Sequence, residues 1–217
     1  MEERIGERQV AEVIFLEKGR VCIRFAHGVE AALYRSELRS LTEVECRLLT
    51  SEGAYIQEAL YQKIICGIVG LRAKKRAIFL LERMDRTEHQ LCDKLKRAGY
   101  PQECIEQAIH YVKSYHYVDD LRYARQYIRL GKQKKSRQRL RMDLMQKGVA
   151  RDTIEQALEE EYCADERRKI KELLEKRHYD CDCKDRREQQ RMYQFLMRRG
   201  YKGSDILAVM RCGFDYE

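Results

Sequence analysis

A pattern of apolar residues around three glycines constrains the fold of this 217-residue chain more than any other feature. With Gly99, Gly148 and Gly200 in register, apolar residues recur eight and four positions before each glycine, and one, six and ten positions after it. The glycines are 49 and 52 residues apart. A period of this length indicates an array of small units that bury their apolar faces by stacking. The five columns are Leu91, Leu140 and Met192; Leu95, Leu144 and Leu196; Tyr100, Val149 and Tyr201; Ile105, Ile154 and Ile206; and Ile109, Leu158 and Met210.

Each unit has the pattern of three helices. Apolar residues four positions apart share a helical face, and the glycine that follows suits the left-handed conformation at a helix end. The middle helices are expected to begin at Thr87, in a capping box with Gln90, and near Ser136. Another helix precedes each pair, over 72–83, 120–130 and 165–177. The predicted fold class is therefore mainly α, an elongated tandem array of three three-helix repeats.

Residues 8–34 have a different pattern, which is typical of β-structure. Two runs rich in Val, Ile and Phe flank turn residues at 17–20, and a second turn is expected at 26–30. We predict a small N-terminal β-unit of three strands. A long helix is then predicted over 51–69, in which Gly67 and Gly70 mark a bend or a break.

These patterns divide the chain into four parts. We predict a β-unit over 1–48 and a linking helix with the first repeat over 49–116. The second repeat is predicted over 117–162 and the third over 163–217.

The second repeat also contains the highest density of positive charge. From Arg122 to Arg151 there are eleven Lys and Arg residues and one acid, Asp143, whereas the whole chain has a net charge of +8. At about 100° per residue, Arg122, Arg125 and Arg129 share one face of the repeat's first helix, opposite its apolar face. The candidate partner-binding residues are Arg122, Arg125, Arg129, Lys132, Lys134, Lys135, Arg137, Arg139 and Arg141.

This basic surface has two interpretations. A run of charge is usually a solvated helix face, but a face stabilised by surface ion pairs interleaves acids with bases. Crowded like charges reduce stability unless an external partner neutralises them. We therefore favour a polyanionic partner. Tyr123 and Tyr127 are expected to belong to the core rather than to stack on nucleic-acid bases.

The sequence lacks the patterns of an enzyme, a metalloprotein or a membrane protein. It has no phosphate-binding Gly-rich loop and no Gly-x-Ser-x-Gly motif, and its five His have no metal or triad spacing. The cluster of His178, Cys181 and Cys183 lacks a second ligand pair, so neither a metal nor a cofactor is expected. The first residues do not resemble a signal peptide, and the longest apolar run, over 64–71, is too short to cross a bilayer.

The protein is therefore expected to be cytoplasmic, with reduced cysteines. Four of its nine Cys lie at positions of the apolar period, so we predict that they are thiols of the core. These are Cys22, Cys66, Cys92 and Cys104.

The second repeat carries a specific motif. It reads Y-V-D-D-x-R-Y-A-x-x-Y-I from Tyr117 to Ile128 and is followed by a basic turn and by Gly148 and Val149. The first repeat has a related order, with R-T-E before its two leucines and Gly-Tyr after them. In these residues the chain resembles the RecX family, whose members regulate the RecA recombinase. The resemblance covers most of the chain, including the β-unit, and is weakest in the third repeat.

The resemblance implies a modular array that lodges in the groove of the RecA–DNA filament and modulates, usually inhibits, the recombinase and ATPase activities. The partners implied are the RecA filament and, through its phosphates, DNA, in homologous recombination, DNA repair and the SOS response. The alternative is a direct DNA-binding protein whose helix-turn-helix-like units read a DNA groove. We expect a monomer that is not an enzyme and has no cofactor.

Overall fold

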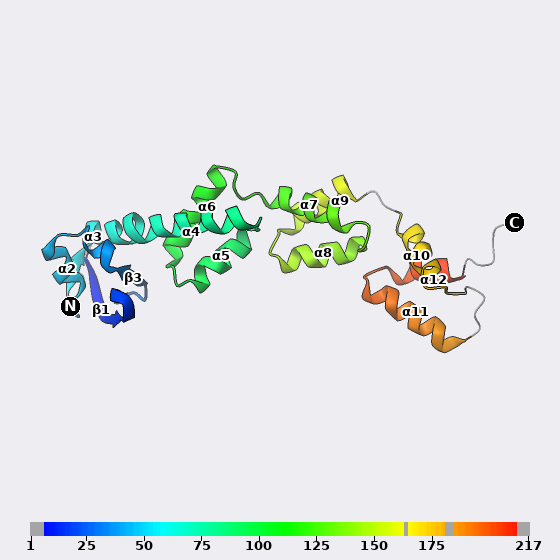
Figure 1. The fold of residues 1–217 in the computed structure, drawn as a ribbon, viewed down its shortest axis with the longest axis horizontal. Helices are drawn as coiled ribbons and strands as arrows, with labels where there is room; N and C mark the ends of the chain where they lie inside the picture. Colours follow the sequence, from blue (N-terminus) through cyan, green and yellow to red (C-terminus); the bar gives the residue numbers. More distant parts are fainter. Residues whose placement is uncertain (1–6, 163–164, 181–184, 212–217) are drawn as a thin grey trace. The chain divides into compact units, whose positions relative to one another are not determined.

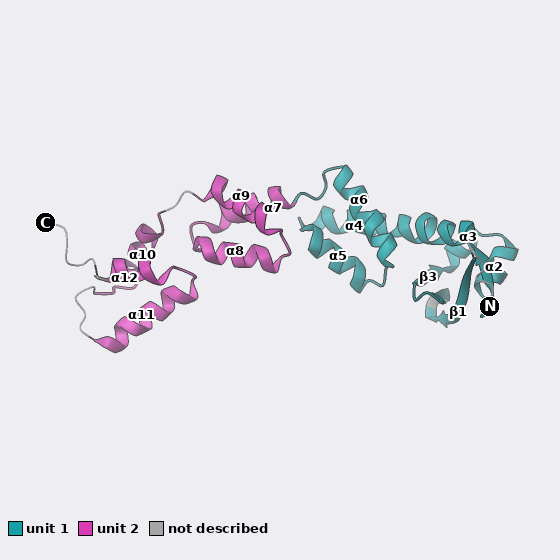
Figure 2. Ribbon diagram, turned by 180° about the vertical axis from the view of Figure 1, so that it is seen from behind, with its two compact units in different colours: residues 1–119 teal, residues 120–217 magenta. Residues whose placement is uncertain are grey.

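The structure, a computed structural model, describes residues 7–162, 165–180 and 185–211 (Figure 1). It divides into two compact units, residues 1–119 and 120–217 (Figure 2). Unit 1 contains a small sheet and the first three-helix repeat, and unit 2 contains the second and third repeats. The predicted fold class, mainly α with an N-terminal β-unit and three-helix repeats, is confirmed.

The N-terminal sheet has four strands rather than the predicted three. Its order is β3-β2-β1-β4, and neighbouring strands are antiparallel. The additional strand, β4, has only three residues, too few for a period that a sequence could reveal; pairing with the start of β1 makes it a strand. The strands are β1 (Glu7–Leu16), β2 (Arg20–Phe25), β3 (Glu30–Tyr34) and β4 (Tyr55–Gln57), with a 3-10 turn at Glu17–Gly19.

The long helix that links the sheet to the first repeat begins at Glu58, later than predicted. Gly67 and Gly70 do not break it, but the α-helix gives way to a π-helical segment over Lys63–Val69, which contains Gly67 and ends just before Gly70. A Cβ at Gly70 would lie 2.9 Å from Oε1 of Gln107 and 3.1 Å from the carbonyl oxygen of Ile65, which is five residues earlier in the same helix, so the π-helical segment leaves little room for a side chain here. The helical segments up to this point are α1 (Arg35–Leu38), α2 (Glu43–Leu49), α3 (Glu58–Gln62), a π-helical turn (Lys63–Val69) and α4 (Gly70–Arg83).

Each repeat consists of three helices, as the sequence predicts. The predicted caps are present, because the hydroxyl groups of Thr87 and Ser136 accept backbone N–H groups of α5 and α8. In the third repeat Asp185 accepts the backbone N–H of Arg187 and caps α11. The helices that follow α4 are α5 (Glu88–Arg97), α6 (Gln102–Ser114), α7 (Asp120–Gly131), α8 (Arg137–Gln146), α9 (Arg151–Glu161), α10 (Glu166–Glu175), α11 (Arg186–Arg198) and α12 (Gly203–Arg211).

The three aligned glycines end the middle helices in the left-handed conformation. Their φ angles are +79° at Gly99, +80° at Gly148 and +83° at Gly200. After Gly148, the N–H of Val149 donates to the carbonyl of Leu144 at 3.1 Å, and the other two repeats have the same bond. This is the Schellman arrangement, in which the two hydrogen-bonded residues also pack together. The bond joins two of the apolar columns of the repeat.

The apolar columns form the cores. In the second repeat Leu140, Leu144 and Ile154 are fully buried and pack with Ala124 and Ile128 of α7. The third repeat has its own cluster of buried residues, whereas the core of the first repeat is continuous with that of the sheet. Each repeat of unit 2 is therefore stabilised by its own core.

The cysteines agree in part with the prediction of core thiols. All four are free thiols, but among them only Cys104 is buried, and Cys22, Cys66 and Cys92 are half-buried. Burial is the main reason that the pKa of Cys104 is raised to about 12. Cys66 and Cys92 pack against the edge of the core of unit 1, because a residue at the edge of a core follows the same period as one at its centre. Cys22 is half-buried on β2.

Replacing Leu144 by Ala should lower the free energy of unfolding by about 2–4 kcal/mol, since the lost side chain leaves a cavity in the core. The control is Leu130→Ala, because Leu130 is 76% exposed on α7. Urea denaturation followed by circular dichroism measures both. Equal effects of the two substitutions would contradict the assignment of Leu144 to the core.

Candidate functional site

The nine candidate basic residues lie on α7, α8 and the turn between them, within unit 2. The opposite face of α7 is buried through Ala124 and Ile128. The predicted division of this helix into an apolar and a polar face is therefore correct. The exposed members of the set are Arg122, Arg129, Lys134 and Arg139, and the half-buried members are Arg125, Lys132, Lys135, Arg137 and Arg141.

Two arginines of α7 form ion pairs with carboxylates of α9, which packs beside α7. Arg129 donates from Nη2 to Glu161 at 2.6 Å and from Nε at 3.2 Å. Arg125 donates from Nε and Nη2 to Glu160, the latter at 2.9 Å. These hydrogen bonds hold the pKa of both glutamates below the usual value. Both ion pairs are on the solvent-facing side of the repeat.

A third carboxylate of α9, Glu155, faces α8. Arg141 donates to its two oxygens at 2.6 and 2.8 Å, and Nη2 of Arg137 lies 3.8 Å from it. The hydrogen bonds from Arg141 lower the pKa of Glu155. In addition, Nζ of Lys132 donates to the backbone carbonyl of Glu161 at 3.2 Å.

Asp143, the one acid within the basic window, is 7% exposed and contacts two of the candidate cations and a tyrosine. Its Oδ2 accepts hydrogen bonds from Nζ of Lys135 at 2.7 Å and from the hydroxyl of Tyr127 at 3.0 Å. Its Oδ1 lies 3.1 Å from Nε of Arg139. Burial raises the pKa of Asp143, but the hydrogen bonds from Lys135 and Tyr127 outweigh this and hold it below the usual value.

The acid-poor surface expected from the sequence is therefore not what the folded repeat presents. Residues 119–162 contain eleven Lys and Arg and eight Asp and Glu, with most of the acids outside the basic window. Packing of α9 against α7 and α8 brings three of these acids beside the arginines. A stretch of sequence without acids can therefore still have carboxylates beside its arginines in the folded repeat.

Tyr123 and Tyr127 pack against the core cluster of the second repeat, as predicted. Their rings are stacked, with centroids 6.4 Å apart. Nζ of Lys135 lies 4.9 Å and Nζ of Lys147 lies 5.2 Å from the centre of the Tyr127 ring. The two tyrosines therefore connect the core to the cations at the edge of the surface.

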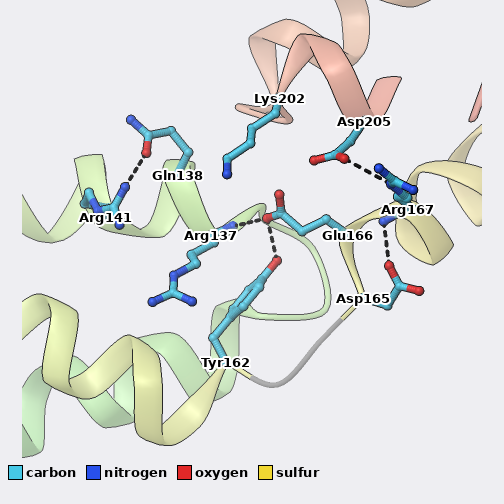
Figure 3. Close-up of a pocket in the computed structure, with 9 residues that line it drawn as sticks. All are labelled: Arg137, Gln138, Arg141, Tyr162, Asp165, Glu166, Arg167, Lys202 and Asp205. Carbon is cyan, nitrogen blue, oxygen red and sulfur yellow. Dashed lines mark hydrogen bonds and ion pairs between the residues drawn. The ribbon is translucent and has the colours of Figure 1, made fainter. Parts of the chain in front are cut away.

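A cleft of about 460 Å³ lies between the second and third repeats (Figure 3). Oε1 of Glu166 accepts the first backbone N–H of α8, from Arg137, at 2.7 Å and the hydroxyl of Tyr162 at 3.0 Å. Nε of Arg167 donates to Asp205 at 3.1 Å. The lining is thus polar, and Arg167 with Asp205 is the one ion pair formed between two of the described residues that line it. Its lining residues are Arg137, Gln138, Arg141, Tyr162, Asp165, Glu166, Arg167, Lys202 and Asp205.

The third repeat has a further basic surface, on α11, that the charge count along the sequence did not identify. Arg187, Arg191 and Arg198 are all exposed. At about 100° per residue their side chains fall within about 40° of one another on the helix. They are spread over the length of the helix, so they form no dense run; their helical spacing is the signal that could have revealed them.

The part of the chain that the structure describes has neither a candidate metal site nor a candidate membrane-spanning helix. There, no three or more His, Cys, Asp and Glu side chains are grouped so as to hold a metal ion. Cys181 and Cys183 of the cluster noted above lie outside the described residues. No described helix combines the length and the apolar character needed to span a bilayer.

Tandem three-helix units with separate cores and charged outer faces define a class of helical repeat protein. Models of RecX domains match the three repeats in order: the first three-helix domain matches residues 73–111, the second 119–158 and the third 165–210. The chain belongs to the RecX family, which confirms the resemblance noted in its sequence.

Proteins with similar sequences support this assignment to the RecX family. Regulatory protein RecX of Vibrio parahaemolyticus is 38% identical over 137 residues, which cover 63% of this chain and 88% of the relative. Regulatory protein RecX of Vibrio campbellii is 35% identical over 148 residues, which cover 68% of this chain and 94% of the relative. A crystal structure of regulatory protein RecX has a TM-score of 0.60 at 24% identity, covering 93% of this chain and 98% of the other. The relatives are thus named as regulatory proteins, and the solved structure shares the fold.

Replacing Asp143 by Asn should destabilise the protein by about 1–3 kcal/mol at neutral pH, because Lys135 and Arg139 lose their carboxylate. Folding lowers the pKa of Asp143, so its stabilisation is present above the unfolded-state pKa and is lost as the pH falls through the folded-state pKa. The difference from wild type should therefore shrink below a pH of about 4.

Urea denaturation at several pH values measures this difference, with Asp152→Asn, on the exposed surface of α9, as the control. A destabilisation of the Asp143 variant that stays constant with pH would show that its ionised carboxylate is not the source of the stability.

Proposed function

We propose that this protein binds the RecA–DNA filament and modulates, most often by inhibition, its recombinase and ATPase activities. Membership of the RecX family supports the proposal, because relatives that match over most of their length are regulatory proteins. The observation that carries it is the match of all three repeats, in order, to RecX domains.

The basic residues of α7 and α8 are the proposed contact with the filament. An exposed ion pair contributes only about 0–1 kcal/mol, so Arg125 and Arg129 can exchange their glutamates for an external anion at small cost. A filament of RecA on DNA is polyanionic, and cations that neutralise it release counterions. The internal pairs hold the guanidinium groups at the surface in the unbound protein. The proposed contact residues are Arg122, Arg125, Arg129, Lys132, Lys134, Lys135, Arg137, Arg139 and Arg141.

Direct DNA binding is the second candidate function, and the three-helix units with exposed basic faces favour it. A protein that reads a groove should bind bare duplex with sequence preference, through side chains that contact base edges. A filament regulator should prefer the filament and show little sequence preference. Competition between filament, bare single strand and bare duplex separates the two. Equal affinity for all three would contradict filament-specific binding.

The purified protein should lower the rate of ATP hydrolysis by RecA on single-stranded DNA, in proportion to the amount bound to the filament. A coupled ATPase assay at increasing protein concentration measures this effect. A higher rate would reverse the proposed sign of regulation, and an unchanged rate at saturation would refute modulation of the ATPase.

Replacing Arg122, Arg125 and Arg129 together by Ala should weaken filament binding. If each arginine neutralises one phosphate, the slope of log affinity against log salt should become less steep by about 2–3. Circular dichroism melting should show that the variant remains folded, because the outer face of α7 is not part of the core. Unchanged filament affinity in the folded variant would remove these residues from the contact.

A further inference from the structure

The exposed face of α11 carries a stripe of arginines that have no side-chain partner among the residues that the structure describes. Arg187, Arg191 and Arg198 share this face, and Gln194 lies between them on the same side of the helix. Among the described residues, no side chain gives the guanidinium groups of these arginines a hydrogen bond or an ion pair. Arg187 and Arg191, four positions apart, also repel each other, which destabilises an isolated helix.

The register of the repeats explains why these arginines lack carboxylate partners. Thirteen and nine positions before its glycine, the second repeat has Lys135 and Arg139, and both pair with Asp143. The third repeat has Arg187 and Arg191 at the same positions.

The position equivalent to Asp143, five before the glycine, is Phe195 in the third repeat. Its ring is contacted by two other cations, with Cζ of Arg177 at 3.9 Å and Cζ of Arg199 at 4.5 Å from its centre. An aromatic ring attracts a cation but carries no net charge to neutralise it. The third repeat therefore keeps the basic positions of the second without their internal acid.

The first repeat gives a second comparison. Its positions equivalent to Arg187, Arg191, Gln194 and Arg198 are Arg86, Gln90, Asp93 and Arg97. An acid and a neutral residue thus interrupt the row on α5. Three arginines on one face of the middle helix are a property of the third repeat and not of the repeat pattern.

We propose that α11 is a binding site for the sugar-phosphate backbone of single-stranded nucleic acid, with Arg187, Arg191 and Arg198 each contacting a phosphate and Gln194 donating a hydrogen bond between them. Exposed arginines without internal partners bind phosphate without first breaking an ion pair. At about 1.5 Å per residue the stripe is about 16 Å long. A single strand lying along this length can present one phosphate to each of the three arginines.

This site refines the proposed function and rests on it, because the strand that the α11 arginines would contact is the single-stranded DNA of the filament. It predicts that the protein alone binds the bare strand in a salt-dependent way. Because the contacts are to phosphates, binding should not depend on the base sequence.

The test is binding of a fluorescein-labelled oligothymidylate, followed by fluorescence anisotropy between about 50 and 200 mM salt, without RecA. Replacing Arg187, Arg191 and Arg198 by Gln should reduce the slope of log affinity against log salt by about 2, at about 0.7 per phosphate contact in a single strand. Replacing the same three residues by Lys should restore the slope, since charge is retained.

The matched control removes three exposed arginines that do have carboxylate partners, and so changes the net charge equally. It combines Arg24→Gln, Arg47→Gln and Arg168→Gln, whose partners include Glu30, Glu43 and Glu172. The control should keep the wild-type slope. If the control loses as much slope as the α11 variant, binding depends on total charge and the site is refuted. An unchanged slope in the α11 variant would also refute the site.

The two proposals fail in different ways. If wild-type protein alters RecA ATP hydrolysis while the α11 variant binds the bare strand normally, only the α11 site is refuted. If the α11 variant loses binding to the bare strand while wild-type protein has no effect on RecA, the site stands and the regulatory function is refuted.

Discussion

The hydrogen bond that closes the middle helix of each repeat is the interaction on which the rest of the repeat depends. It joins the N–H of the residue after the glycine to the carbonyl of a buried leucine, and it requires the left-handed backbone observed at all three glycines. A side chain with a Cβ is disfavoured in that conformation. The turn brings the third helix back onto the leucines of the second, so that about fifty residues can form a core.

The same backbone conformation recurs where no glycine is present. His116 and His178 have φ angles of +55° and +53° at the ends of α6 and α10. In both, the N–H of the next tyrosine donates to a carbonyl five residues earlier, at 2.9 Å for Tyr117 and 3.1 Å for Tyr179. The chain thus ends several of its helices by one backbone arrangement, with glycine where the sequence repeat requires it.

Conserving this backbone leaves the outer faces of the repeats free to differ. In the second repeat, carboxylates of α8 and α9 form ion pairs with most of the nine candidate basic residues. In the third, Phe195 occupies the position of Asp143, and the neighbouring arginines of α11 face solvent. Helices with the same core positions therefore present different charge distributions to a partner.

The sequence by itself determined the repeats, their three helices, the caps of the first two middle helices and the core positions of the repeat. These follow from the spacing of apolar residues and from the conformational freedom of glycine, which are properties of neighbouring residues. The cap of α11, Asp185, was found only in the structure. The tertiary structure alone decided the fourth strand, the unbroken helix through Gly67 and Gly70, and the partners of the basic residues. Glu160 and Glu161 lie 35 and 32 positions from the arginines they bind, and no local pattern relates residues so far apart. These opposite charges come together only when α9 packs beside α7, and this packing requires the whole repeat to be folded.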